Sequence, residues 1–331
     1  MDNFSKSEKE IYDLRKQKIS FLNELTSNSF PTKFNESVKV ADVIKEHSEI
    51  KDGEHTGVNV SIRGRILNAR SFGKLLFYDL LDQSGKIQLL INSGEIDELY
   101  LKLFENFDIG DIIAVNGEII KTKKGELSIK VNETTILSKS LRTLPEKWHG
   151  LKDKETRFRQ RYLDLIVNPE SKKILQTRSN VVRLLREYLH ANEFIEVETP
   201  ILQSKAGGAI AKPFQTHHNA LNLDMYLRIA PELYLKRLVI GGFEKVFEIG
   251  KIFRNEGIDQ THQPEFTMLE SYQAYADMNI VMDMVEDMCN YVFDNLEIDK
   301  KLEFNGEEAS FSGPWKRVSM YDLVSEKFGI K

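Results

Sequence analysis

Two predicted strands, 245–254 and 266–275, flank a polar loop and carry residues whose types could do chemistry. Side chains along a strand alternate between its faces, so Glu270 and Tyr272 share one face at a spacing of roughly 7 Å. Burying an unpaired carboxylate costs several kcal/mol, so Glu270 needs a cation, either from the protein or from a ligand. The pattern indicates a cation-binding position, or else a half-solvated sheet face.

Arg254 ends the first of these strands, next to the polar loop. Its guanidinium offers five donors in a planar fork, which suits an oxygen-rich anion. The alternative is an ordinary surface ion pair, and the residue types alone leave both interpretations open.

The chain is long enough for two domains to position these residues. It has 331 residues, of which 41% are hydrophobic and 29% charged, with a net charge of −5, as in a folded globular protein. It has no run of about 18 apolar residues and no apolar signal-peptide core near its charged N-terminus, so we expect a cytoplasmic protein outside the membrane. The mildly acidic total still allows a local basic stripe that binds nucleic acid.

The single cysteine and one histidine pair are the other chemically notable residues. Cys289 lies in an apolar helical context, so we expect a buried structural thiol. One cysteine excludes, within one chain, a disulfide framework or a cysteine-based zinc site. His217 and His218 resemble a metal pair, but adjacent residues of an extended segment point to opposite sides, so we assign them no ligand role.

The N-terminal part is predicted to be a charged helix followed by a barrel. Residues 5–26 mix charges with apolar positions before Pro31 stops the pattern, which predicts a helix on a solvated appendage. From residue 58 the hydrophobic period changes to two. Strands over 58–62, 75–81 and 87–91, a helix over 98–107, and strands over 111–121 and 126–131 follow, which is the element order of a five-stranded OB barrel.

A larger mixed domain is predicted after the barrel. The highly charged segment 152–162 is expected to be a hinge, with the domain boundary near 145–155. An amphipathic helix from about Ile174 to Leu189 leads to a short strand ended by Pro200. Further predicted elements are strands over 225–229, 245–254 and 266–275, and a helix over 232–240 closed by Gly241 and Gly242.

Six short segments occur in order: RQRYLDL (159–165), FIEVETP (194–200), GGA (207–209), KPF (212–214), RIAPEL (228–233) and FRNEG (253–257). They closely resemble class II lysyl-tRNA synthetases, and the match covers about residues 50–325. The resemblance implies an α+β protein with an N-terminal OB-fold β-barrel followed by a truncated, antiparallel-sheet class II catalytic domain. The implied division is a helical extension and linker over 1–50, an anticodon-binding OB-fold over 51–145, and a partial catalytic domain over 146–331.

The resemblance implies an ATP site on the strand pair and its loop. Arg254 matches the arginine that binds the α-phosphate of ATP and the amino acid carboxylate, and it is the implied catalytic residue. Glu256 matches the glutamate that reads the adenine amino group, and His262 matches a phosphate-side histidine. Phe266 matches the phenylalanine that stacks on adenine.

The same resemblance implies a lysine site that also includes Arg254. Glu232 and the backbone of Gly208 match the groups that hold the α-ammonium, and glycine suits a close approach of ligand to backbone. Glu270 and Tyr272 match the residues that receive the lysine ε-ammonium, which supplies the cation that the strand-face argument requires.

In the barrel, Phe77, Gln88 and Glu126 match positions that contact the tRNA anticodon by stacking and by hydrogen bonds to base edges. A lone phenylalanine on a barrel strand is otherwise more often a core residue. The implied partners are tRNA(Lys), lysine and ATP, with Mg²⁺ as cofactor and a homodimer formed through the catalytic domain. The implied reaction forms lysyl-adenylate and then transfers the lysyl group to tRNA without a protein nucleophile.

The sequence also departs from the family. Gln263 and Lys212 replace the family's usual asparagine and arginine, which affects the loop and one cationic contact. The family continues past residue 331 with magnesium carboxylates, further lysine-pocket residues and a second ATP-binding arginine. We therefore expect the metal ligands in that segment, none among these residues, and a fragment inactive alone.

Two alternatives belong to other classes: an OB-fold RNA-binding module without catalysis, and a truncated paralogue that attaches lysine to an acceptor other than tRNA. The retained barrel argues against the second, because a protein acceptor has no anticodon. The retained pocket residues argue against the first.

Overall fold

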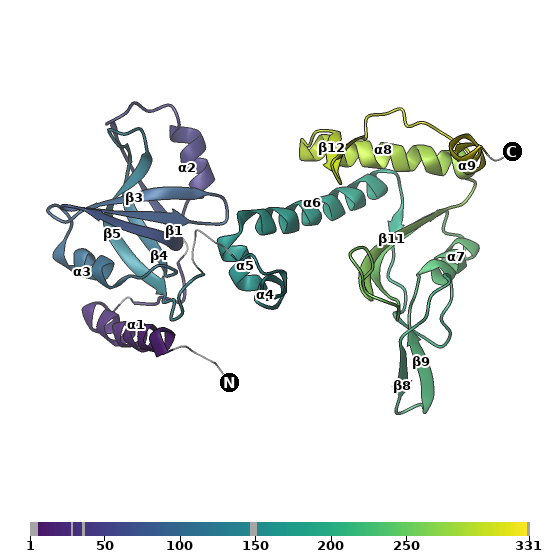
Figure 1. The fold of residues 1–331 in the computed structure, drawn as a ribbon, viewed down its shortest axis with the longest axis horizontal. Helices are drawn as coiled ribbons and strands as arrows, with labels where there is room; N and C mark the ends of the chain where they lie inside the picture. The colour runs from purple at the N-terminus through teal and green to yellow at the C-terminus, as the bar shows by residue number, and fades with distance from the viewer. Residues whose placement is uncertain (1–5, 28, 35–36, 146–150, 330–331) are drawn as a thin grey trace. The chain divides into compact units, whose positions relative to one another are not determined.

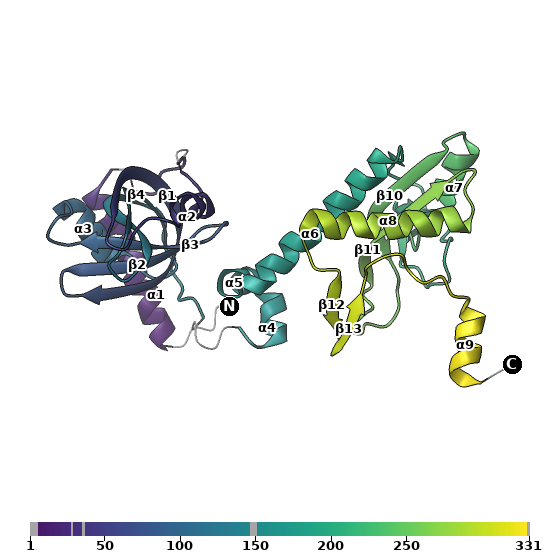
Figure 2. The same cartoon turned by 90° about the horizontal axis from the view of Figure 1, so that it is seen from above.

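The computed structural model describes residues 6–27, 29–34, 37–145 and 151–329. The chain forms two compact units, Met1–Pro169 and Glu170–Lys331, and each is described by itself (Figures 1 and 2). The boundary predicted near 145–155 includes residues 146–150, which lie outside the described residues.

A closed barrel with the strand order β1-β2-β3-β5-β4 makes up most of the first unit. Its strands are antiparallel neighbours except β3 and β5, which are parallel. The predicted OB-type element order is confirmed. The elements of this unit are α1 (Lys6–Leu25), α2 (Val40–His47), β1 (His55–Phe72), β2 (Leu75–Leu81), β3 (Lys86–Asn92), α3 (Glu98–Asn106), β4 (Ile112–Lys121), β5 (Leu127–Ser138), α4 (Lys154–Arg159) and α5 (Arg161–Val167).

The period-two pattern places alternate barrel residues inside. Leu80, Leu89, Ile119 and Ile129 come from four different strands and are fully buried, which is the main stabilising contribution to a domain of this size. Phe104 of α3 packs into the same cluster and its carbonyl accepts a hydrogen bond from the Tyr78 hydroxyl at 3.0 Å. Tyr78 and Leu80 of β2 lie in this cluster, so strand alternation puts Phe77 and Asp79 on the opposite face of the strand.

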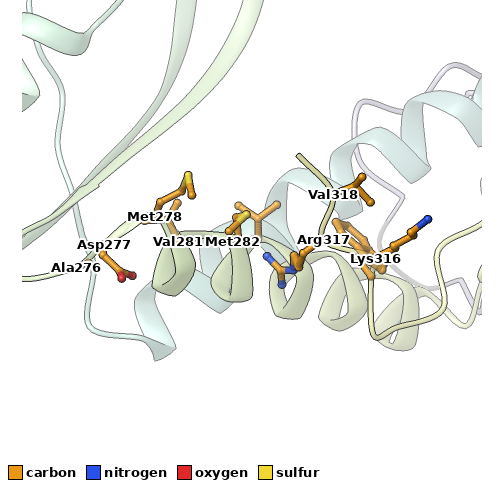
Figure 3. Close-up of a pocket in the computed structure, with 10 residues that line it drawn as sticks. Ala276, Asp277, Met278, Val281, Met282, Lys316, Arg317 and Val318 are labelled. Atoms are coloured by element: carbon orange, nitrogen blue, oxygen red, sulfur yellow. The ribbon is translucent and has the colours of Figure 1, made fainter. Parts of the chain in front are cut away.

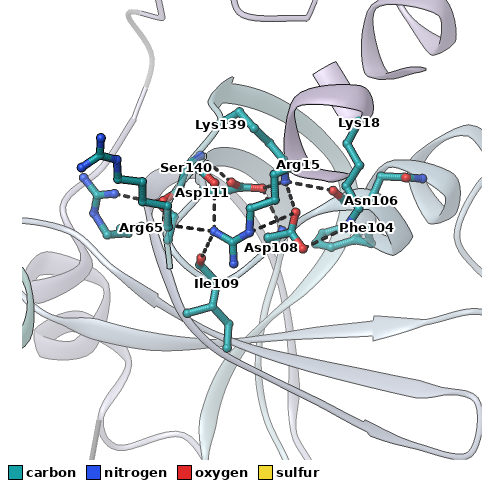
Figure 4. A network of polar contacts seen from close by, with 12 residues as sticks. Arg15, Lys18, Arg65, Phe104, Asn106, Asp108, Ile109, Asp111, Lys139 and Ser140 are labelled. Atoms are coloured by element: carbon teal, nitrogen blue, oxygen red, sulfur yellow. Dashed lines mark hydrogen bonds and ion pairs between the residues drawn. The ribbon is translucent and has the colours of Figure 1, made fainter. Parts of the chain in front are cut away.

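Helix α1 packs onto the barrel, so the expectation of a solvated appendage is wrong. Leu22 is fully buried in the barrel core. The Arg15 guanidinium donates to the carbonyls of Ser140 at 2.9 Å and Ile109 at 3.3 Å, and Lys18 Nζ lies 2.8 Å from Asp108 Oδ1 (Figure 4). These partners are distant in the sequence, so the sequence pattern alone predicts that Arg15 and Lys18 are exposed to solvent.

The charged segment after residue 151, which we predicted to be a hinge between domains, forms two short helices. Helices α4 and α5 are held together by Asp164, which is completely buried. Its carboxylate accepts from Arg157 Nε at 2.7 Å and also pairs with Arg161. The local run of charges is thus a compact ion-pair cluster.

Two three-stranded sheets and a small hairpin form the second unit, with sheet orders β11-β10-β6 and β7-β9-β8 and the pair β12-β13. The predicted helix over 232–240 and the predicted strands around 225–229, 245–254 and 266–275 are confirmed. The elements are α6 (Pro169–Ala191), β6 (Ile195–Glu196), β7 (Leu202–Gln203), β8 (Gln215–His218), β9 (Leu223–Leu227), α7 (Glu232–Ile240), β10 (Lys245–Phe253), β11 (Glu265–Gln273), α8 (Met278–Leu296), β12 (Lys301–Phe304), β13 (Glu307–Ser310) and α9 (Met320–Phe328).

The β10–β11 pair has one face for the core and one for the candidate site. Phe247 on the first face packs with Leu189 of α6 and Met288 of α8. Helix α7 contacts both strands. The antiparallel register puts Glu248 opposite Glu270 on the second face, so two carboxylates are neighbours there.

Candidate active site

Glu270 and Tyr272 lie on the second face of β11, as strand alternation predicts. The Tyr272 hydroxyl donates to Glu270 Oε2 at 3.3 Å. Burial is the main cause that raises the pKa of Glu270, and the charges of Glu232 and Glu248 add to it against the opposing effects of Tyr272 and Arg254. Within the described parts of the chain no ion pair reaches Glu270. The position is therefore short of positive charge.

The Tyr272 phenol lies in the same negatively charged surroundings as Glu270. Burial, followed by the charges of Glu270 and Glu232, raises the pKa of Tyr272 well above its ordinary value, so Tyr272 stays a neutral donor at physiological pH. Lys236 Nζ lies 6.0 Å from the centre of the Tyr272 ring, which is the outer limit of a cation–π contact.

Glu232 is placed at the start of α7, beside Gly208. Its Oε1 pairs with Lys236 one turn further along the helix. Gly208 has a φ of +88°, and a Cβ there would lie 2.9 Å from Glu232 Cβ and 3.6 Å from Glu232 Oε2. Only glycine fits this backbone without strain, so the Glu232 carboxylate lies close to the Gly208 backbone.

Arg254 follows β10 and is half-buried. Its guanidinium carbon lies 5.2 Å from the centre of the Phe266 ring, and Nε and Nη2 each lie 3.5 Å from the Ile229 carbonyl oxygen. The Arg254 N–H donates to the Pro264 carbonyl at 2.9 Å. Arg254 and Phe266 are thus brought together. Among the described residues the Ile229 carbonyl is the hydrogen-bond acceptor found for the guanidinium, which leaves further donors for an anion.

The loop between β10 and β11 carries the remaining predicted residues at the surface. Glu256 is exposed, and its Oε1 accepts from the Lys212 N–H at 3.3 Å. His262 Nδ1 lies 2.8 Å from Asp259 Oδ2. Hydrogen bonds from the Thr261 N–H and from His262 lower the pKa of Asp259 to about 2. The loop is ordered by its own contacts and open to solvent on the outside.

Sequence reasoning missed a buried charge pair beneath this face. Arg228, just after β9, pairs with Glu248 of β10, and both are almost completely buried. The Thr199 hydroxyl donates to Glu248 Oε2 at 2.6 Å. Arg228 and Thr199 both lie in segments that carry the family resemblance, but only the strand register identifies their shared partner.

The barrel residues predicted to contact an anticodon share the outer face. Phe77 of β2 is half-buried and lies outside the core cluster, between Arg70 of β1 and Leu90 of β3 in the register. Gln88 of β3 accepts from the Ser128 hydroxyl at 3.0 Å. Glu126 is exposed immediately before β5. Phe77 and Gln88 thus lie on adjacent strands, and Glu126 lies just before β5, the next strand in the barrel.

Within the part of the chain that the structure describes, the histidine pair and the cysteine named in the sequence analysis show no sign of a functional site. His217 Nδ1 lies 2.9 Å from Asp224 Oδ1, and His218 Nδ1 accepts from the Leu221 N–H at 3.3 Å. Cys289 is only half-buried, less than expected, and burial raises the pKa of its thiol. In the described ranges no group of three or more His, Cys, Asp or Glu side chains is placed to hold a metal ion.

An open apolar cavity of about 620 Å³ lies elsewhere in the second unit, between α8 and residues 315–318 (Figure 3). Met278, Val281 and Val318 are among its lining residues. None of the predicted site residues lines it, so the candidate site is the β10–β11 face and not this cavity.

Comparison with known families agrees with this architecture. The model of "tRNA synthetases class II (D, K and N)" matches residues 153–331, and that of "OB-fold nucleic acid binding domain" matches residues 60–137. The chain belongs to the class II tRNA synthetase family of the D, K and N group.

The relatives it matches carry a more specific name. It is 48% identical over 333 residues to the "Lysine--tRNA ligase" of Clostridium botulinum strain Hall, covering 99% of this chain and 65% of the relative. It is 49% identical over 328 residues to that of Clostridium perfringens strain SM101, covering 98% and 64%. For the Syntrophomonas wolfei ligase the identity is 46% over 329 residues, covering 98% and 66%. The chain thus spans a little under two thirds of their length.

Proposed function

We propose that this chain is the barrel-and-pocket part of a lysine–tRNA ligase, which joins lysine to ATP as lysyl-adenylate and passes the lysyl group to tRNA(Lys). The observation that carries the proposal is the pair Glu270–Tyr272, a half-buried carboxylate beside a neutral phenol. Among the residues that the structure describes, no cation forms an ion pair with this carboxylate. A partly desolvated carboxylate of this kind favours a ligand cation strongly.

The lysine ε-ammonium suits this position in charge and in hydrogen bonding. An ammonium offers three donors, and Glu270 is an acceptor while Tyr272 holds one of its oxygens in place. At the other end of lysine, Glu232 Oε2 beside Gly208 is available to the α-ammonium. The two carboxylates support recognition of an amino acid that carries two positive charges.

ATP is proposed to bind on the Arg254 side of the same face. The guanidinium is placed to bind the α-phosphate and the lysine carboxylate together, and so to stabilise the charge that develops as the carboxylate oxygen attacks phosphorus. Phe266 offers an aromatic surface for adenine, Glu256 an acceptor for its amino group, and His262 a donor toward the outer phosphates. We assign Arg254 the catalytic role.

The barrel is proposed to recognise the anticodon. Phe77 presents a ring on the outer face for base stacking, and Gln88 and Glu126 provide donor and acceptor groups for base edges. We propose 51–145 as the anticodon-binding domain and 146–331 as part of the catalytic domain. A homodimer through the catalytic domain and a cytoplasmic location complete the proposal. Among the helices in the described ranges, none has both the length and the apolarity that crossing a membrane requires.

Magnesium is the expected partner of ATP in this chemistry, where it neutralises phosphate charge. The described residues offer no cluster of ligands for it, so the steps above are assigned only to the chain's own side chains.

Binding of non-reactive adenylate analogues tests the amino acid. We expect the chain to bind a lysyl-sulfamoyl-adenosine at least about 100-fold tighter than the aspartyl and asparaginyl analogues, because a pocket built for an ammonium leaves its carboxylates unpaired with the others. Calorimetry measures the three affinities. Equal affinity for the aspartyl analogue would contradict the proposal.

A further inference from the structure

Arg228 and Glu248 form a buried ion pair next to the candidate lysine pocket. Their side chains are 2% and 4% exposed. Arg228 also donates from Nε to the Lys251 carbonyl at 2.9 Å and from Nη1 to the Thr199 carbonyl at 3.2 Å. The Thr199 hydroxyl accepts from Arg228 at 3.1 Å and donates to Glu248 at 2.6 Å. Each charge is therefore held in one geometry by several partners, as buried charges must be.

Gly250 makes room for the guanidinium. A Cβ at this position would lie 2.1 Å from Arg228 Nη2 and 3.2 Å from Glu248 Oε1. Any side chain at this position would displace Arg228, so the absence of one lets the guanidinium lie flat against β10.

Glu270 lies directly beside this pair. Glu248 and Glu270 are opposite each other in the β10–β11 register, and Cβ atoms of such a pair are about 4.5–5.5 Å apart. The charge of Glu248 contributes to the raised pKa of Glu270, which agrees with their closeness. The buried Arg228 guanidinium is thus ion-paired with Glu248, and Glu248 is in turn the register neighbour of Glu270.

We propose that Glu248 is a specificity-determining positioning residue, which neutralises Arg228 and so leaves the Glu270 carboxylate uncompensated for the substrate's terminal ammonium. The proposal rests on the proposed function and deepens it. We assign Glu248, whose side chain is 4% exposed, no contact with substrate; it acts by holding the buried Arg228 guanidinium, so that this charge does not compensate Glu270. Without the Glu248 charge, Arg228 becomes the counter-ion of Glu270 and the pocket loses its preference for a cation.

Lysine and norleucine test this, because they share a chain length and differ in the terminal ammonium. Calorimetry on the chain gives the ratio of their dissociation constants. We expect Glu248→Gln to lower the preference for lysine at least tenfold. The double variant Arg228→Gln with Glu248→Gln removes the misplaced cation, and we expect it to restore the preference to within about threefold of wild type.

Further variants separate this role from a merely structural one. Structural weakening lowers the affinity for both amino acids and leaves their ratio unchanged. Gly250→Ala keeps both charges but displaces the guanidinium, so it should also lower the ratio. Asp111→Asn is the matched control, because Asp111 forms an equally buried pair with Lys139 in the barrel, and it should leave the ratio unchanged.

The outcomes are distinct. If wild type prefers lysine and both Glu248→Gln and Gly250→Ala keep that preference, the proposed role of Glu248 is overturned. The proposed function is then unaffected. Equal ratios in the single and double Gln variants would overturn it as well. A wild-type chain that binds norleucine as well as lysine would overturn the proposed function, and this inference with it.

Discussion

The Tyr272 hydroxyl donates to Glu270 Oε2 across 3.3 Å, although the two residues are two positions apart on the same strand. This contact uses one acceptor of the carboxylate, and the negative charges of Glu232 and Glu248 act on the same group. It is the local geometry on which the proposed recognition of lysine depends.

Glu270→Gln should weaken binding of the lysyl-adenylate analogue by at least about 2 kcal/mol, because a buried charge-assisted hydrogen bond is lost. Calorimetry on the chain checks it. Glu265→Gln is the matched control, since Glu265 lies on the same strand but forms an exposed pair with Lys251 at 2.9 Å. Equal affinity in wild type and Glu270→Gln would remove Glu270 from the pocket.

The same substitution should stabilise the ligand-free chain at neutral pH. Burial raises the pKa of Glu270 above its ordinary value of 4.5, so the unfolded state releases its proton at a lower pH than the folded state. Stability therefore falls as pH rises from about 4.5 through the folded-state pKa. The Glu270→Gln variant does not lose stability in this way, because glutamine does not ionise.

Denaturant unfolding at several pH values from 4 to 7 measures the effect. The stability of Glu270→Gln relative to wild type should increase across this window. A difference that stays constant with pH would show that Glu270 ionises normally in the fold.

Gly208→Ala should weaken binding at the proposed α-ammonium end of the lysine site. Its φ of +88° disfavours alanine, and the new Cβ would lie 2.9 Å from Glu232 Cβ, so the backbone or Glu232 must move. We expect weaker binding of the lysyl-adenylate analogue, by about tenfold or more. Gly257→Ala is a suitable control, because nothing lies within 4 Å of a Cβ there.

Phe77→Ala should reduce affinity for tRNA(Lys) by roughly 1–3 kcal/mol, because a stacking surface is removed from the outer face of the barrel. Filter binding measures it. Binding of the lysyl-adenylate analogue should stay near that of wild type, since the pocket is in the other unit. Loss of the barrel's thermal transition would instead identify Phe77 as a core residue.

Leu22→Ala should destabilise the barrel by about 2–5 kcal/mol, because it leaves a cavity where α1 packs into the core. Leu22 is fully buried, whereas Leu14 of the same helix is 55% exposed, so Leu14→Ala is the control and should change stability little. Hydrogen exchange of barrel amides reports the change. Equal protection in both variants would mean that α1 contributes no stability.

Local sequence patterns were sufficient to predict many of the secondary-structure elements. The switch to a period of two after residue 58 predicted the barrel strands, and the apolar spacing with Gly241 predicted the helix at Glu232–Ile240 as the structure has it. Strand alternation also placed Glu270 and Tyr272 on one face. These features follow from the chain's own geometry within a few residues, so a single sequence contains them.

Only the tertiary structure decided which charges meet. The pair Arg228–Glu248 depends on β9 and β10 coming together, the neighbours Glu248 and Glu270 depend on the strand register, and the docking of Arg15 depends on carbonyls more than 90 residues away. Hydrophobic periodicity says which face of an element is buried, but it does not say what lies opposite. Such contacts form only when desolvated charges find partners in the packed chain. For that reason the sequence indicated the candidate site residues, while packing decided that Arg228 pairs with Glu248.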